Sequence, residues 1–423
     1  MNGTVSRRVA AVLLAAMLTA ALQVTAHARI KLTTLPERER VEIQLDNPAA
    51  TLVEEERVVT LLAGANTIDF SWSNTAIDKS TIQFRVVQMP LRDKRADDPV
   101  TLVRPDGKVE MIRVISVGFP PGENALTWEV YAEKPFAARV RISYLIGNLN
   151  RSFNYRAVAE NDESKLTLWN YIRLDNLSGE EFGTSGIWAG FGNYFQKMVG
   201  INEAKQMLAW KFDGVPVKKT FTFDWWNGQP VPNEPDQRYV AMRYVLKNDK
   251  EHSMGLFPLE QGKVRIFQKD AHGGEAFIGE DWGKFTPIDD EMKLYLGLAR
   301  DIEVKRKMAR NVRQETILTV FDQDVVIEYT VKNFKKSAVT LDITEDMNRL
   351  RDEVCIQRPH DAEWQVVPEG TSLPAAAIER KDSRTLELHV ALPAADPDGK
   401  AVVAATTVTV HLSLKNEWQE VSR

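Results

Sequence analysis

The chain has 423 residues, with 54 Lys and Arg against 59 Asp and Glu and a formal net charge of −5 at pH 7. That acidic balance argues against broad binding to nucleic acids or anionic membrane surfaces. The chain is longer than one ordinary hydrophobic core can serve, so we expect two or more domains. A single cysteine, Cys355, excludes an internal disulfide.

The N-terminal segment has the pattern of a secretory signal peptide. Arg7 and Arg8 precede an apolar run, residues 9–22, and Ala26-His27-Ala28 is a small-x-small cleavage site. We therefore predict that residues 1–28 are removed and that the protein is periplasmic or secreted. The paired arginines leave the twin-arginine export route open beside the general one. No later run approaches the roughly 20 apolar residues of a membrane-spanning helix.

Alternating apolar and polar residues predict that most of the chain forms β-strands. The clearest alternating runs are residues 41–45, 82–86, 139–144 and 165–169. Successive side chains of a strand point to opposite faces, so each apolar set can line a core while the polar set meets water. We predict an N-terminal β-sandwich-like domain at residues 29–145 and a larger β-rich domain at residues 146–423.

The larger domain contains two predicted strand pairs. Residues 264–268 and 276–279 flank the pair Gly273-Gly274, which favours a hairpin. Residues 325–332 are predicted to pair with residues 338–345, because the apolar residues of both runs would then share one face. The predicted fold class is mainly β, with two antiparallel, immunoglobulin-like β-sandwich domains.

One aromatic segment, residues 183–210, interrupts the alternation. Its apolar residues recur at spacings of three and four, which favours one or two short helices. A long surface loop or flap is the alternative, because Gly190, Gly192 and Gly200 weaken a helix. Aromatic side chains of this kind can anchor a partner or stack on a sugar ring. The candidate binding residues in and after the segment are Trp188, Phe191, Tyr194, Trp225 and Trp226.

Strands and glycine turns alternate from Gly262 to Met347, and an Asn176-Leu-Ser-Gly-Glu-Glu181 turn lies upstream. This order resembles the bacterial family called domain of unknown function 4139, which includes mucoidy-inhibitor-like proteins. The resemblance implies a sandwich domain followed by a β-rich domain, and it supplies no catalytic residue. The long coiled coil that many members carry is absent here, because the sequence has no sustained apolar heptad.

Familiar catalytic and metal-binding motifs are missing from the sequence. There is no Gly-x-Ser-x-Gly nucleophile elbow and no His-Glu-x-x-His pair, so we expect no cofactor and no metal. His272 is expected in an exposed glycine turn, while His389 and His411 are expected to be ordinary sheet residues. The histidines after the predicted signal are His252, His272, His360, His389 and His411.

Carboxylates provide the remaining candidates for catalysis. Glycoside hydrolysis uses two carboxylates about 5–10 Å apart in one groove. The acids that could assemble such a pair are Asp224, Glu280, Asp281 and Asp289. The competing interpretation is that these are surface acids beside turns.

Three functions are consistent with the sequence. The favoured one is a non-catalytic binding protein of the cell envelope that recognises a protein or glycan partner. One alternative is a structural or assembly component that self-associates through open sheet edges. The other is a glycan-active hydrolase that uses two of the four acids, and it is less favoured because catalytic motifs are missing.

Overall fold

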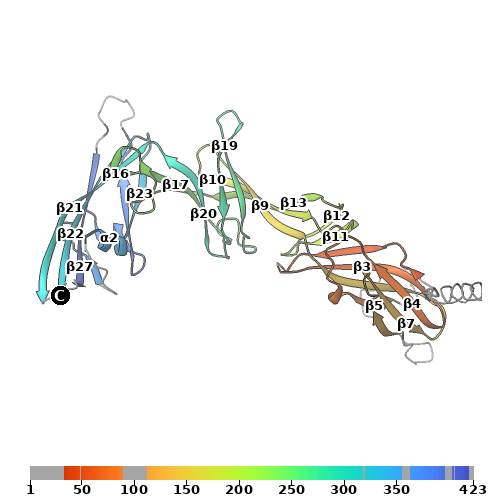
Figure 1. Ribbon diagram of the computed structural model, residues 1–423. Coiled ribbons are helices and arrows are strands. Elements are labelled where there is room, and N and C mark those ends of the chain that lie inside the picture. The colour runs from red at the N-terminus through yellow and green to blue at the C-terminus, as the bar shows by residue number, and fades with distance from the viewer. Residues whose placement is uncertain are drawn as a thin grey trace, which may run out of the picture. The chain divides into compact units, whose positions relative to one another are not determined.

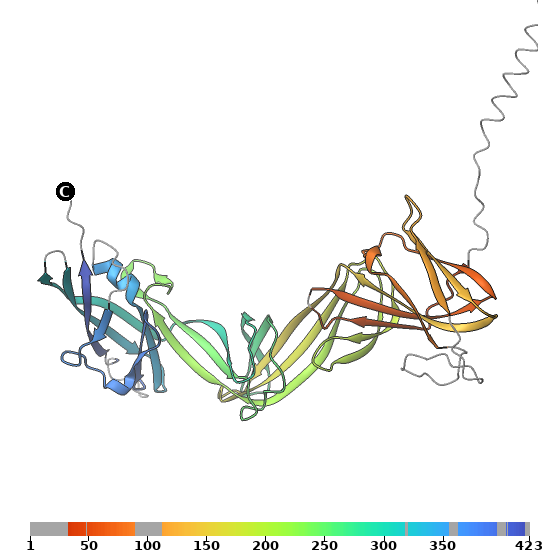
Figure 2. The same cartoon turned by 90° about the horizontal axis from the view of Figure 1, so that it is seen from below.

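The computed structural model describes residues 33–47, 49–88, 112–317, 320–354, 363–395, 403 and 405–418 (Figures 1 and 2). In this part of the chain the regular structure is almost entirely β-strand, with one α-helix, so the predicted mainly β fold is confirmed. No helix among the described residues has the length and apolar composition needed to cross a bilayer. The predicted signal peptide, Cys355 and His360 lie outside the described residues.

The chain divides into two compact units. The first comprises Met1–Arg151 and Leu174–Lys205, and the second comprises Ser152–Arg173 and Gln206–Arg423. This division differs from the predicted boundary after residue 145, and it places most of the aromatic segment in the first unit. The reason is strand pairing, since residues 186–188 pair with residues 42–44.

Two sheets form the first unit. Sheet A has the order β1-β4-β7-β6, with bounds β1 Thr33–Thr34, β4 Gly64–Ser71, β7 Ala125–Ala132 and β6 Arg113–Gly118. Sheet B has the order β12-β11-β2-β3-β8-β5, with bounds β12 Tyr194–Val199, β11 Gly183–Trp188, β2 Arg40–Gln44, β3 Thr51–Leu61, β8 Phe136–Ile146 and β5 Gln83–Gln88. A single turn of 3-10 helix, Lys79–Thr81, precedes β5.

An aromatic core joins sheets A and B into a sandwich. Phe70 and Trp128 of sheet A are buried against Phe84 and Tyr144 of sheet B. The ring centroids of Phe84 and Trp128 lie 4.9 Å apart, and those of Phe70 and Tyr144 lie 6.1 Å apart. The inward residues of the strands therefore supply the core that period two predicts.

Three further sheets contribute to the second unit. Sheet C has the order β13-β10-β9-β18-β19, with bounds β13 Ala204–Pro216, β10 Lys165–Asn176, β9 Leu149–Ala159, β18 Gly262–Lys269 and β19 Glu275–Gly283. Sheet D has the order β20-β17-β14-β23-β26-β25, with bounds β20 Glu291–Ala299, β17 Val240–Lys247, β14 Lys218–Asp224, β23 Val339–Asp346, β26 Thr385–Leu392 and β25 Ile378–Arg380. Sheet E has the order β15-β16-β21-β22-β27-β24, with bounds β15 Pro230–Val231, β16 Glu234–Arg238, β21 Ile302–Ile317, β22 Val320–Asn333, β27 Ala405–Trp418 and β24 Glu363–Val366.

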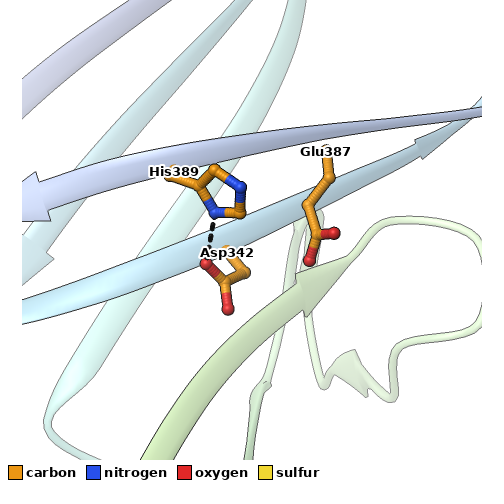
Figure 3. A group of neighbouring side chains, drawn as sticks. All are labelled: Asp342, Glu387 and His389. Carbon is orange, nitrogen blue, oxygen red and sulfur yellow. Dashed lines mark hydrogen bonds and ion pairs between the residues drawn. The ribbon is translucent and has the colours of Figure 1, made fainter. Parts of the chain in front are cut away.

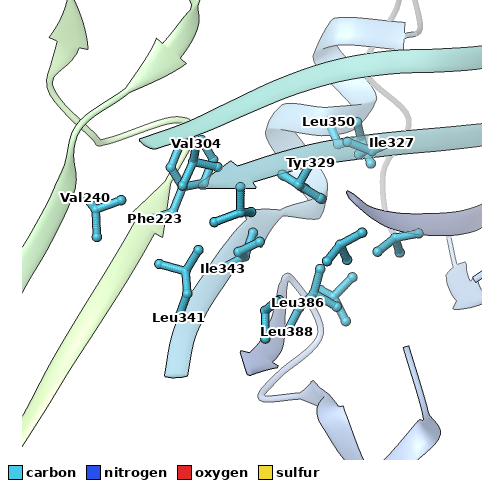
Figure 4. Close-up of a cluster of buried hydrophobic side chains, with 14 of the residues drawn as sticks. Phe223, Val240, Val304, Ile327, Tyr329, Leu341, Ile343, Leu350, Leu386 and Leu388 are labelled. Atoms are coloured by element: carbon cyan, nitrogen blue, oxygen red, sulfur yellow. The ribbon is translucent and has the colours of Figure 1, made fainter. Parts of the chain in front are cut away.

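Sheets D and E pack face to face around an apolar core (Figure 4). Phe223 of sheet D meets Tyr329 of sheet E edge to face, with ring centroids 6.2 Å apart. Helix α2, Met347–Val354, follows β23 and buries Met347 and Leu350 in the same cluster. A 3-10 turn, Ala375–Ala377, leads into β25.

The predicted pairing of residues 325–332 with residues 338–345 is wrong, although the predicted faces are right. Strand β22 pairs with β21 and β27, whereas β23 pairs with β14 and β26. Tyr329 and Ile343 both point into the core, but from opposite layers. The connection at residues 334–338 therefore carries the chain from sheet E to sheet D.

The predicted helices at residues 183–210 are also wrong, because the segment forms β11, β12 and the start of β13. Phe191 has a φ of 52°, and Gly190 and Gly192 have φ values of 91° and 76°. Such left-handed backbone ends a helix but suits a hairpin turn. The hairpin predicted around Gly273-Gly274 is confirmed, since β18 pairs with β19.

The inward orientation of β23 gives a stability prediction. Replacing Ile343 with Ala should cost about 2–5 kcal/mol of unfolding free energy, because Ile343 is fully buried. The neighbouring control Thr340→Ala lies on the exposed side of the same strand and should stay within about 0.5 kcal/mol. Equilibrium urea denaturation measures both, and equal losses would contradict the orientation.

Candidate functional site

The outer face of sheet B carries an exposed aromatic pair. Trp188 of β11 and Tyr194 of β12 are cross-strand partners, and their ring centroids lie 4.7 Å apart. Trp188 is 41% exposed and Tyr194 is 45% exposed. The structure thus brings two of the predicted binding residues together, with Phe191 in the turn that joins their strands.

Glu42 fixes the orientation of this pair. The indole Nε1 of Trp188 donates a hydrogen bond of 2.8 Å to Oε2 of Glu42, which lies on the neighbouring strand β2. Gly186 lies opposite Glu42, and a Cβ at this position would lie 2.4 Å from Glu42 Oε2 and 2.4 Å from the Tyr194 hydroxyl. A side chain at this position would push the Glu42 carboxylate and the Tyr194 hydroxyl aside, so glycine lets both groups approach the backbone.

A hollow of about 320 Å³ adjoins the aromatic pair. Its walls combine the indole with acidic, amide and guanidinium groups from three strands. The lining residues are Arg40, Glu42, Gln44, Glu54, Glu56, Arg141 and Trp188. This hollow and the aromatic pair together are called the Trp188 face below.

Each carboxylate of the Trp188 face is held by a partner. Arg40 Nε lies 2.6 Å from Glu42 Oε1, and Arg141 Nη2 lies 2.7 Å from Glu56 Oε1. Glu54 receives hydrogen bonds from Gln44 at 3.1 Å and from Arg85 at 2.8 Å. Charge-assisted bonds of this kind hold planar groups in place. The face therefore offers fixed donors and acceptors beside an aromatic surface.

The Asn176–Glu181 turn is hydrogen-bonded to the chain next to β11 and β12. The buried side-chain amide of Asn176 donates hydrogen bonds of 2.8 Å to the carbonyls of both Glu180 and Gly200. Arg38 ties the same turn to sheet B, because it pairs with both Glu180 and the buried Glu55. The turn that carries part of the family resemblance thus positions the aromatic hairpin.

Trp225 and Trp226 lie elsewhere, in the second unit, where they pack against the core cluster. They follow the end of β14 in a turn that Asp224 caps by accepting the backbone N–H groups of Trp226 and Asn227, each at 2.9 Å. Two guanidinium groups contact the Trp225 ring, with Arg238 at 4.1 Å and Arg306 at 5.1 Å from its centroid. These two tryptophans therefore pack against the core of the second unit, and they do not line the hollow of the Trp188 face.

Trp226 belongs to a buried ionic cluster. Its Nε1 donates to Glu345 Oε2 at 3.1 Å, while Arg306 Nε lies 2.7 Å from Glu345 Oε1. Tyr329 donates to the same carboxylate at 2.5 Å, and Arg306 also forms a two-pronged pair with Glu353. Burial raises the pKa of Glu345, and the charge of Arg306 opposes that rise. The cluster is structural, because its groups satisfy one another inside the sandwich.

The buried pair gives a second prediction. Replacing Arg306 with Met should destabilise the protein by about 3–5 kcal/mol, because it leaves the Glu345 carboxylate buried without its cation. Urea denaturation of the variant measures the loss. The control Lys263→Met removes the cation of an exposed pair with Glu280 and should have a small effect. A small effect of both substitutions would contradict the assignment.

The four acids proposed for hydrolysis do not converge. Asp224 caps a turn, and Asp289 is a turn residue with a φ of 67°. Glu280 pairs with Lys263 and Arg265, and the hydrogen bond from Lys263 lowers the pKa of Glu280. Asp281 accepts the backbone N–H groups of Trp282 and Tyr295. None of the four lines the hollow beside Trp188, and none lines the two hollows of about 620 and 480 Å³ in the second unit.

His411 is held on both ring nitrogens. Nδ1 lies 2.6 Å from the carbonyl oxygen of Glu369, and Nε2 bonds the carboxylate of Asp324. Burial by itself would lower the pKa of His411, but these two acceptors raise it above the ordinary 6.5. Because the folded state holds the proton more tightly, the charged ring stabilises the fold at low pH. That contribution is complete below the unfolded pKa and is lost as pH rises through the folded pKa.

Replacing His411 with Gln should therefore destabilise the protein more at about pH 5.5 than at about pH 9. Urea denaturation at the two values measures the difference. The control His272→Gln changes an exposed turn residue and should have little effect at either pH. A larger loss for His411→Gln at the higher pH would contradict the assignment.

The sequence did not predict that charged residues would line the Trp188 face. The available signal was the alternation at residues 40–44, which places Arg40, Glu42 and Gln44 on the face opposite Val41 and Ile43. The chain matches no known family model and no curated protein. The resemblance to domain of unknown function 4139 thus stays a prediction.

Proposed function

We propose that this chain is a secreted or periplasmic, non-catalytic binding protein of the cell envelope, and that the Trp188 face binds a glycan. The observation that carries the proposal is the exposed Trp188–Tyr194 pair beside a hollow of about 320 Å³ with charged walls. The predicted export signal supports the compartment in this proposal, and the resemblance to domain of unknown function 4139 supports the family.

The chemistry of a sugar ring suits this arrangement. The C–H bonds on one side of the ring carry slight positive charge, and they can lie against the electron-rich face of Trp188. Sugar hydroxyls can then exchange hydrogen bonds with Glu42, Gln44 and Glu54, whose positions are already set by their partners. Because these groups are ordered before the ligand arrives, binding costs little side-chain entropy.

A glycan is favoured over a protein partner because of the charge density around the aromatic pair. The centre of a protein interface is depleted of charged residues, with Arg as the exception. Here three glutamates and two arginines line one small hollow. Catalysis is not proposed, because cationic or amide partners hold each of these glutamates.

An oligosaccharide array built from cell-envelope polysaccharide fragments tests the proposal. We expect wild-type protein to bind one class of fragment. Replacing Trp188 with Ala should weaken that binding about tenfold or more, the loss expected when a central aromatic contact is removed.

The matched control is Trp282→Ala, since Trp282 is 60% exposed and lies in the second unit. It should bind like wild type. Absence of glycan binding by the wild type, or equal losses in both variants, would refute the proposal. Capture of a protein through Trp188 with no glycan bound would instead favour the protein-partner alternative.

A further inference from the structure

Three potential metal ligands meet on the outer face of sheet D. Asp342 lies on β23, and Glu387 and His389 lie on the adjacent strand β26. Asp342 is directly opposite His389 in the strand register, and Glu387 is two residues from His389 on the same face. Figure 3 shows the three side chains gathered together, with His389 bonded to Asp342.

The donor atoms lie close to one another. One ligand atom from each of the three residues lies within 4.8 Å of the other two, and His389 Nδ1 is 2.8 Å from Asp342 Oδ1. Zn²⁺ binds nitrogen and oxygen at about 2.0–2.2 Å in tetrahedral geometry, so two donors on one ion lie roughly 3.3–3.6 Å apart. Donors that lie up to 4.8 Å apart must therefore approach by up to roughly 1.5 Å, which side-chain rotation can supply.

The charged groups nearest to His389 are mainly acidic. Glu379, opposite Glu387 on β25, brings a third carboxylate, and its Oε2 lies 3.4 Å from His389 Nε2. One ammonium, that of Lys381, pairs with Glu387. Three carboxylates thus face one lysine beside His389. The wider hollow of about 480 Å³ also has Lys218, Arg243, Lys293 and Glu291 in its lining, so its four basic and four acidic groups balance.

We propose that Asp342, Glu387 and His389 bind a divalent transition-metal ion of the Zn²⁺ type. Imidazole nitrogen with carboxylate oxygen is a ligand set that suits Zn²⁺ and its first-row neighbours. Ca²⁺ prefers six to eight oxygen ligands, so a site with one imidazole and few oxygens discriminates against it. The ion displaces the Lys381 ammonium from Glu387 and replaces the hydrogen bond between His389 Nδ1 and Asp342.

Other histidine–carboxylate pairs in the described chain lack the third ligand. His252 lies 2.6 Å from Asp249, and His411 bonds Asp324, but neither gathers a third metal-ligating side chain. The third metal-ligating side chain therefore distinguishes the His389 cluster from an ordinary ionic pair. It also supplies a matched control on the same unit.

Isothermal titration of the purified protein with Zn²⁺ alone, and separately with Ca²⁺ alone, tests the proposal. We expect one Zn²⁺ per chain and weaker binding of Ca²⁺. Replacing His389 with Gln or Asp342 with Asn should lower Zn²⁺ affinity about tenfold or more, since even residues that only support a ligand cost 10–100-fold. The control His252→Gln should leave the affinity unchanged.

A second kind of variant distinguishes loss of a ligand from loss of folding, because it should bind Zn²⁺ more tightly than wild type. Replacing Lys381 with Met removes the competing ammonium and should tighten Zn²⁺ binding without removing a ligand. Wild-type protein that binds no Zn²⁺, ligand variants that bind like wild type, or an unchanged affinity in Lys381→Met would each overturn the proposal. Any of these results would leave the cluster as an ionic network.

Discussion

Each sheet in this protein must bury one face, and the rest of the structure depends on that constraint. Side chains alternate along a strand, so burial of Val41 and Ile43 sends Arg40 and Glu42 to the opposite surface. The same rule buries Leu388 and leaves His389 at the outer face of sheet D. The Trp188 face and the Asp342 cluster are therefore both consequences of how the cores are built.

Buried charge adds a more specific requirement in the second unit. The carboxylate of Glu345 is contacted by Arg306, Tyr329 and Trp226, which come from both layers of one sandwich. Removing any of these partners leaves part of a buried charge unsatisfied, which is costly in a low-dielectric interior. The sheets must therefore pack in one alignment for the cluster to be complete, whereas apolar packing by itself tolerates small slips.

The local pattern predicted much of the fold. Alternation identified the strands around residues 41–45 and 139–144, and paired glycines identified the turn of the β18–β19 hairpin. Prediction failed where two structures share one pattern. The apolar residues at 183–210 recur at helical spacings, but Gly190, Phe191 and Gly192 have left-handed backbone, which a helix does not allow. The inward-facing apolar residues of β22 and β23 are another example. They are compatible with two strands that pair in one sheet and also with two strands in opposite layers.

The sequence by itself determined which side chains of a strand share a face, because that periodicity is a local property of the backbone. It also identified Trp188 and Tyr194 as aromatic candidates. Only the tertiary structure decided which strands became neighbours. Trp188 meets Glu42 across 146 positions of sequence, and His389 meets Asp342 across 47. Contacts of that separation depend on long-range strand pairing, which alternation within one strand does not encode.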